Sequence, residues 1–194
     1  MTDRVRPRQV VVGYDFSPIS DEALGLAVEI ACREPIHVLH ILTAIDSRHG
    51  LPIAPVAKAD YEYCERIQQL LGERVREVFA GRKSAGEVHF FVHARLGHAA
   101  DEVLQLSAEV GADLILVGSH GRTGVDRLVL GSVSEKIMRE AKCPVMVVRP
   151  RTYRDAQLLD VVDEDHPHHH HNKPHRYSYV ETRVITRPPD WPLN

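Results

Sequence analysis

The sequence predicts an α/β fold of the doubly wound type, with a parallel sheet sandwiched between helices. Short apolar runs alternate with segments of helical periodicity from residue 9 to residue 150, and several of the apolar runs are hydrophobic along most of their length. Alternation of this kind favours parallel pairing through right-handed crossovers, and continuously apolar strands are expected where helices cover both faces. Ligands of such folds bind at the carboxyl ends of the strands, where the strand order reverses.

Each predicted element rests on a local pattern. Five apolar runs predict strands over residues 9–14, 36–42, 87–94, 113–118 and 143–150. Helical stripes predict helices over residues 17–34, 58–80, 98–112 and 132–141. Ser17 or Ser20 can cap the first helix, and Gly111 is placed to end the third. Residues 43–57 hold several chain breakers and no clear period, so we expect a loop there.

Composition and charge limit the class of protein. Hydrophobic residues make up 43% and charged residues 26% of the 194 residues, as in soluble globular proteins. The net charge of -3 excludes a domain-wide basic footprint for nucleic acid, and no apolar run is long enough to span a membrane. The N-terminal stretch has no apolar signal core, and the three cysteines lie far apart. We therefore expect a cytoplasmic protein with reduced thiols.

A loop rich in glycine follows the fourth predicted strand. Gly118, Gly121 and Gly131 surround it, and Ser132 opens the next helix with Glu135 at the spacing of a capping box. A helix N-terminus presents free N–H groups to a phosphate, and glycine removes side chains that would keep a ligand from the backbone. The same spacing also fits a plain strand-loop-helix connection. No G-K-[ST] sequence follows the loop, and no G-x-G-x-x-G sequence follows the first strand.

Several segments together resemble the universal stress protein family. The spacing G-x2-G-x9-G-S from Gly118 to Ser132 resembles its ATP-binding signature. The segments "VVVGYDFSPISDEAL", "LGHAADEVLQLSAEVGADLI" and "LGSVSEKIMREAKCPVMVVRP" resemble its opening strand, third helix and closing segment. The resemblance covers about residues 8–150. It implies a sheet of five strands in the order 3-2-1-4-5, membership of the ATP-binding branch, and a homodimer formed through the last strand.

The resemblance also implies which residues contact the nucleotide. They are Asp15, Ile41, Gly118, Gly121, Arg122, Gly131, Ser132, Val133 and Ser134. Asp15 corresponds to the aspartate that meets the ribose, the backbone of Ile41 to the adenine contact, and most of the others to phosphate contacts. The residues alone also allow roles without a ligand: Asp15 as a turn residue, Ile41 as a core residue, and Arg122 and Ser134 as solvent-exposed residues.

Residues 151–194 depart from the family pattern and predict a separate C-terminal extension. Its first part is acidic and then rich in histidine, typical of a linker, and could bind a divalent metal weakly through His168, His169, His170 and His171. Residues 177–187 alternate between two sets of side chains, which predicts a β-strand that pairs with a sheet edge, most simply across a dimer. The histidines elsewhere are scattered, which favours structural roles over a metal site.

The resemblance implies an ATP-binding regulator of a stress response, with Mg²⁺ accompanying the nucleotide. Two alternatives remain open: slow ATP hydrolysis on the same fold, and metal buffering through the histidine-rich tail. ATP pyrophosphatases and nucleotidyl transferases require an SGG-type loop after the first strand or an H-x-G-H motif. The chain has "VGYDFSP" at the first place and lacks the second motif, and it presents no set of catalytic residues.

Overall fold

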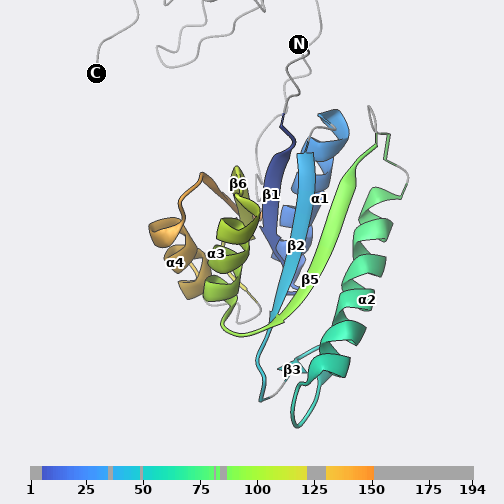
Figure 1. Ribbon diagram of the computed structural model, residues 1–194, viewed down its shortest axis with the longest axis vertical. Helices are drawn as coiled ribbons and strands as arrows, with labels where there is room; N and C mark the ends of the chain where they lie inside the picture. Colours follow the sequence, from blue (N-terminus) through green and yellow to red (C-terminus); the bar gives the residue numbers. More distant parts are fainter. Residues whose placement is uncertain are drawn as a thin grey trace, which may run out of the picture. The chain divides into compact units, whose positions relative to one another are not determined.

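The computed structural model describes residues 6–34, 37–48, 50–80, 82–83, 87–121 and 130–150. The elements, drawn in Figure 1, are β1 (Arg8–Gly13), α1 (Pro18–Arg33), β2 (His37–Ile45), β3 (Gly50–Leu51), β4 (Ala54–Pro55), α2 (Tyr61–Phe79), β5 (His89–Leu96), α3 (Ala99–Val110), β6 (Leu114–Gly118), α4 (Ser132–Glu140) and β7 (Val145–Val148). The predicted alternation of strands and helices is therefore confirmed.

Five of the strands form one parallel sheet in the order β5-β2-β1-β6-β7. Numbered among the five sheet strands alone, this order is 3-2-1-4-5, so the fold class and strand order expected from the sequence are confirmed. Strand β1 pairs with β2 on one side and with β6 on the other. The strand order thus reverses beside β1, and a ligand crevice is expected at the carboxyl ends of β1 and β6.

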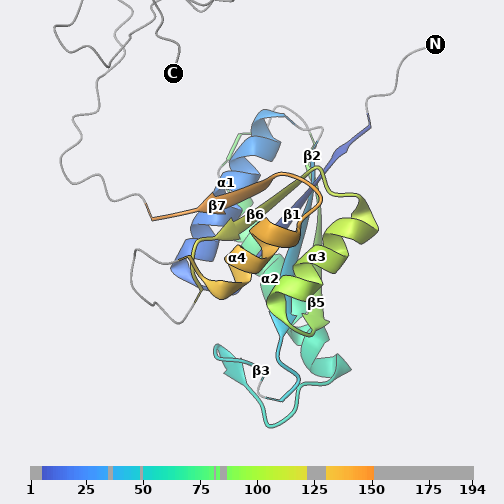
Figure 2. The same ribbon diagram turned by 90° about the vertical axis from the view of Figure 1, so that its left-hand side faces the viewer.

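Helices cover the sheet on both faces (Figure 2). One core cluster joins β1 and β2 to α1 and α2, and it includes Val12, Leu24, Ile41 and Leu71. A second cluster on the opposite face joins the sheet to α3 and α4, and it includes Leu42, Val103 and Ile137. Neighbouring residues of β2 enter opposite clusters because successive side chains of a strand point to opposite faces.

Local signals explain where the first and third helices begin and end. The side chain of Ser17 caps α1 by accepting a hydrogen bond from the amide of Ser20, and Pro18 begins the helix without a donor that would need a partner. Helix α3 ends at Gly111, whose φ of 61° is the left-handed conformation that favours glycine. The capping by Ser17 and the stop at Gly111 are both confirmed.

The expected loop over residues 43–57 is wrong in part. Strand β2 continues to Ile45, and β3 and β4 then form a short antiparallel hairpin. The hydroxyl of Tyr63 holds this hairpin, because it accepts from the amide of Leu51 at 2.7 Å and donates to the carbonyl of Ala54 at 2.6 Å. The partner of the hairpin is a tyrosine on a later helix, so the local pattern of residues 43–57 does not reveal it.

Several expectations lie outside the described residues. These are Arg122, the four tail histidines His168, His169, His170 and His171, the predicted strand over residues 177–187, and the rest of the C-terminal extension after Pro150. The division into residues 1–150 and 151–194 stays a prediction. Among the described residues, no helix is both long and apolar enough to cross a membrane.

Candidate functional site

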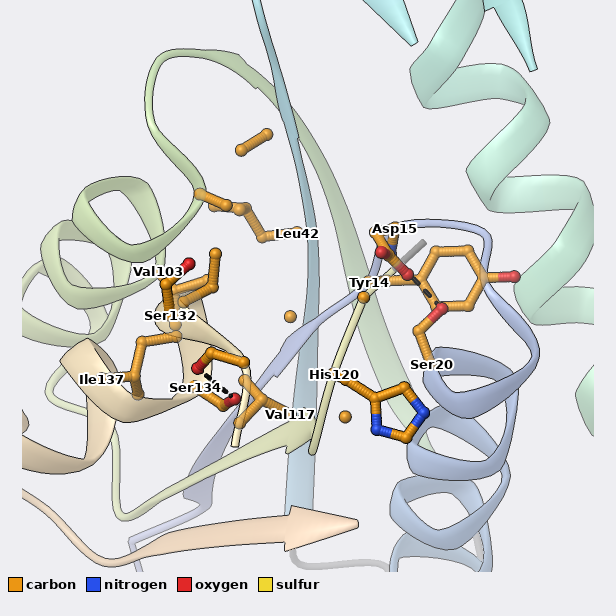
Figure 3. A pocket seen from close by; sticks show the side chains of 17 residues that line it. Tyr14, Asp15, Ser20, Leu42, Val103, Val117, His120, Ser132, Ser134 and Ile137 are labelled. Carbon is orange, nitrogen blue, oxygen red and sulfur yellow. Dashed lines mark hydrogen bonds between the residues drawn. The ribbon is translucent and has the colours of Figure 1, made fainter. Parts of the chain in front are cut away.

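A cavity of about 330 Å³ lies at the carboxyl ends of β1 and β6, where the strand order predicts a crevice (Figure 3). This volume falls at the lower end of the range of roughly 300–1,000 Å³ that small-molecule sites occupy. The apolar part of the lining is formed by Leu42, Ala44, Ala99, Val103, Val117 and Ile137. Apart from Tyr14 and Val133, the rest are small or polar residues. They come from the β1–α1 connection, from the end of β6 with the residues after it, and from the start of α4.

The end of β1, the turn after it and the first turn of α1 contribute Gly13, Tyr14, Asp15 and Ser20 to the lining. The amide of Tyr14 donates to the carbonyl of Leu42 at 2.8 Å, which holds the start of the turn against β2. Asp15 is the next residue. The Oδ1 atom of Asp15 accepts a hydrogen bond from the amide of Ser17 at 3.0 Å. One carboxylate oxygen of Asp15 is therefore fixed to the start of α1, and the side chain stands at the edge of the cavity.

The other carboxylate oxygen of Asp15 approaches the glycine loop. A Cβ atom added to Gly121 would lie 2.9 Å from Asp15 Oδ2. Glycine at position 121 thus lets the aspartate of one connection come close to the backbone of the other. The structure brings together these two predicted site residues, which are 106 positions apart in the sequence.

A side chain at Gly118 or Gly131 would crowd other parts of the protein. A Cβ atom at Gly118 would come within 2.9 Å of Ile19 Cγ2, and one at Gly131 within 3.2 Å of the Cα of His120. Neither glycine has a positive φ, so the left-handed conformation is not what selects them. Both line the cavity, but the atoms that exclude a side chain are those of the protein itself.

Helix α4 points its N-terminus at the cavity, and Gly131, Ser132, Val133 and Ser134 all line it. The expected capping box is wrong: the N-cap residue is Gly131, no side chain caps the helix, and Ser132 is its first residue. The orphan N–H groups at the start of α4 are consequently not taken up by a capping side chain. Ser132 and Val133, the first two residues of the helix, are exposed.

Ser134 is buried, with 2% of its surface exposed, so the solvent-facing alternative is wrong. Its hydroxyl lies 2.9 Å from the carbonyl of Gly131 and 3.1 Å from the carbonyl of Ser119, and donates to them. The amide of Gly131 also donates to the carbonyl of Ser119 at 2.7 Å. These bonds tie the end of β6 to the start of α4 and so fix the position of the first turn of the helix.

Ile41 does not line the cavity. Its side chain is fully buried in the cluster between the sheet and helices α1 and α2, while its neighbour Leu42 lines the cavity from the opposite face. Any contact of Ile41 with a ligand would involve its backbone. The apolar lining residues Leu42, Val103 and Val117 were not singled out by the sequence, because a buried aliphatic residue looks the same beside a cavity and in a filled core.

A polar network behind the cavity also escapes sequence reasoning. Tyr14 donates its hydroxyl to Asp21 at 2.6 Å, and Arg74 of α2 donates to the same carboxylate from two nitrogens at 3.0 Å each. Burial and the neighbouring carboxylate of Asp21 raise the pKa of Tyr14, which keeps its phenol protonated. Figure 3 shows the hydroxyl of Tyr14 directed away from the other side chains that line the cavity.

One histidine of β2, His40, and one of β5, His93, form a pair outside the cavity. His40 Nδ1 lies 3.2 Å from His93 Nε2, and His40 Nε2 lies 2.9 Å from the side-chain oxygen of Gln9. Burial lowers the pKa of His40, and burial together with His40 and Arg95 lowers that of His93 to about 4. In the part of the chain that the structure describes, no three metal-ligating side chains gather at one point.

A sequence model of the universal stress protein family matches residues 7–149. The chain belongs to the universal stress protein family. A universal stress protein of Methanocaldococcus jannaschii is 33% identical over 146 residues, covering 73% of this chain and 82% of that protein. Universal stress protein YxiE of Bacillus subtilis is 31% identical over 149 residues, covering 73% and 98%. The family assignment made from the glycine motif is therefore confirmed.

Among solved structures, a universal stress protein in complex with cAMP is similar to this chain. The two share 26% identity with a TM-score of 0.53, and the match covers 74% of this chain and 98% of the other. Universal stress protein UspA from Lactobacillus plantarum, at 23% identity, matches with a TM-score of 0.55 over 74% of this chain and 99% of that one. The second similarity supports the fold.

Proposed function

We propose that this universal stress protein binds an adenine nucleotide in the cavity at the ends of β1 and β6 and acts as a nucleotide-dependent regulator. The observation that carries the proposal is the pairing of an apolar lining with an uncapped helix start in one cavity. A purine base suits the first, and a phosphate suits the second because free N–H groups and the helix dipole converge on it. Binding of cAMP by a similar universal stress protein supports this choice.

Each part of a nucleotide finds a matching surface. The base would lie against the apolar lining around Leu42 and Val103, with the backbone of Ile41 behind it. The ribose hydroxyls are donors, and the carboxylate of Asp15 is the acceptor at the cavity edge. The phosphates would meet the amides of Gly131, Ser132 and Val133. Ser134 supports that helix start from behind.

A substitution at Ser132 tests the phosphate position. Ser132→Glu places a carboxylate at the first residue of α4, where a negative charge suits the helix but occupies and repels the phosphate site. We expect at least a tenfold loss of affinity for ATP, about 1.4 kcal/mol, with the melting temperature kept. Ser132→Ala is the matched control, which removes only the hydroxyl. Normal ATP binding by folded Ser132→Glu protein would place the phosphates elsewhere.

The identity of the nucleotide is tested on the full chain. Small molecules released on denaturing the purified protein should include an adenine nucleotide. ATP with Mg²⁺, AMP and cAMP should each raise the melting temperature by mass action, and GTP should raise it less. Adding a chelator separates ATP from Mg-ATP, which tests whether the metal accompanies the nucleotide. Equal shifts from ATP and GTP would remove the case for an adenine site.

We further propose a cytoplasmic homodimer that forms through β7. Within the described sheet β7 pairs on one side only, with β6, and Met146 on this strand is 39% exposed. An edge strand presents unpaired N–H and C=O groups with which a strand of a second chain can pair. Sedimentation should show a dimer, and Met146→Lys should shift it toward monomer. A monomeric wild-type protein at micromolar concentration would overturn this part of the proposal.

A further inference from the structure

Phe16 has a backbone conformation that is rare for its residue type. Its φ is 62°, and it is the one non-glycine residue with a positive φ in the described ranges. In this left-handed region the Cβ atom of an L-residue crowds the following carbonyl oxygen, which costs free energy. Such outliers persist where the surrounding structure enforces them, and they are concentrated at functional sites. Phe16 directly follows Asp15, which lines the cavity.

The surroundings of Phe16 explain how this conformation is held. Its side chain packs against two core clusters at once, the one under α1 and α2 and the one around Tyr63 and the β3–β4 hairpin. The ring of Tyr14 meets it edge to face, with 4.9 Å between the ring centroids. Tyr14 is in turn bonded through its hydroxyl to Asp21, which Arg74 also binds. The phenylalanine ring is therefore anchored to both neighbouring helices and to the hairpin.

The residues on each side of Phe16 are fixed by hydrogen bonds. The carbonyl of Tyr14 accepts from the hydroxyl of Thr43 at 3.0 Å, and the amide of Ser17 donates to Asp15 Oδ1 at 3.0 Å. The second of these bonds spans Phe16. The left-handed turn at Phe16 thus determines where the Ser17 amide meets the carboxylate, and so how Asp15 stands beside Gly121 and the cavity.

We infer that Phe16 is a positioning residue for ribose recognition: its anchored ring holds the turn that aims the Asp15 carboxylate at the 2′- and 3′-hydroxyls of the nucleotide. The inference rests on the proposed function. If the fold needed only a left-handed turn here, glycine would supply it without strain. Phenylalanine adds the anchor, which converts a permitted turn into one fixed geometry.

The test compares ATP with 2′-deoxy-ATP on the full chain by calorimetry. Wild-type protein should prefer ATP by about tenfold, as expected for a hydrogen bond to a charged group. Phe16→Gly keeps the left-handed turn but removes the anchor, and should reduce this preference to less than about threefold while 2′-deoxy-ATP still binds. Phe16→Asn, which also tolerates the conformation, provides a second variant without the ring. Phe16→Leu keeps apolar packing and should restore most of the preference.

Two further variants decide between positioning and general destabilisation. Asp15→Asn removes the carboxylate itself and should abolish the preference for ATP over 2′-deoxy-ATP. This variant therefore gives the lowest preference expected. Phe79→Ala removes a phenylalanine that packs against the same cluster as Phe16 but lies at the end of α2, outside the β1–α1 turn, so it should lower the melting temperature and leave the preference intact. An unchanged preference in folded Phe16→Gly or Phe16→Asn protein, or a loss in Phe79→Ala, would overturn the inference. Failure of wild type to bind any adenine nucleotide would instead overturn the proposed function.

Discussion

The two connections that meet at the cavity differ in how they are held and in the residues that they accept. In the β1–α1 turn, side chains make several of the hydrogen bonds: Asp15 accepts from the Ser17 amide, Ser17 caps the helix, and the hydroxyl of Thr43 donates to the carbonyl of Tyr14. Among the described residues between β6 and α4, main-chain hydrogen bonds stand beside those that the Ser134 hydroxyl makes. The amide of Ser119 donates to the carbonyl of Val148, and the amide of Gly131 donates to the carbonyl of Ser119, at 2.7 Å each.

The contacts around Gly118 and Gly131 indicate why glycine occupies these motif positions. On the β6–α4 side the backbone lies against other parts of the protein, so a side chain at Gly118 or Gly131 would crowd them before any ligand binds. On the β1–α1 side the chain tolerates the bulky Phe16 even where φ is positive. A glycine motif beside a cavity therefore indicates tight packing of the connection at least as strongly as it indicates a bound ligand.

We expect the largest loss of stability from a substitution at Gly118, in the connection between β6 and α4. In Gly118→Val, the added Cβ would lie 2.9 Å from Ile19 Cγ2 and 3.3 Å from the carbonyl oxygen of His120. Overpacking of this kind should lower the free energy of unfolding by about 1–3 kcal/mol, measured by denaturant titration without nucleotide. Gly25→Val is the matched control, since a Cβ there meets only the end of the Arg82 side chain at 3.6 Å. Equal stability of the two variants would restore the view that Gly118 serves only a ligand.

Substitution of one serine in each connection, Ser134 and Ser17, should cause smaller losses of stability. Ser134→Ala removes a buried hydroxyl that donates to two carbonyls between β6 and α4, and should cost about 1–2 kcal/mol. Ser17→Ala removes the α1 cap and should cost about 1 kcal/mol. Thermal melts of both variants give the comparison. A larger loss for Ser17→Ala would mean that the β1–α1 turn is the more important of the two.

Much of the fold was predictable because its signals are local. Ser17, Pro18 and Gly111 set helix ends through their own chemistry, and the apolar runs set the strands. The hairpin after Ile45 was not predictable from residues 43–57, because it depends on the hydroxyl of Tyr63, which comes later on α2.

The candidate site was predictable in outline for a different reason. Gly118, Gly121, Gly131 and Ser132 form a sequence motif, and Asp15 follows a strand end, so each of them could be named. The capping box at Ser132 was wrong because spacing alone does not show that Gly131 would serve as the N-cap. The conformation of Phe16 was not predictable, since it results from packing among Tyr14, α2 and the hairpin.

The smallest expected change is a fall in the free energy of unfolding at lower pH, caused by His93 on β5 and not by either connection. His93 has a pKa lowered to about 4 by burial, by His40 and by Arg95, with Glu109 acting in the opposite direction. Between that value and the unfolded value of about 6.5, the unfolded chain binds more protons than the folded one, so the free energy of unfolding falls as pH falls. Because His93 is partly exposed, we expect a loss of about 0.5–1 kcal/mol between pH 7.5 and pH 5.5.

The variant His93→Gln isolates this contribution. Glutamine can still donate a hydrogen bond toward His40 Nδ1 but does not titrate, so its unfolding free energy should fall less between pH 7.5 and pH 5.5 than that of the wild type. The variant also leaves Asp15, Phe16 and the start of α4 untouched, so the ATP preference over 2′-deoxy-ATP should stay the same at pH 7.5. Parallel pH profiles for wild type and variant would show that the histidine pair accepts a proton without cost in the folded protein. A changed nucleotide preference would instead show that the sheet beneath the β1–α1 turn, and not the turn alone, determines how Asp15 is held.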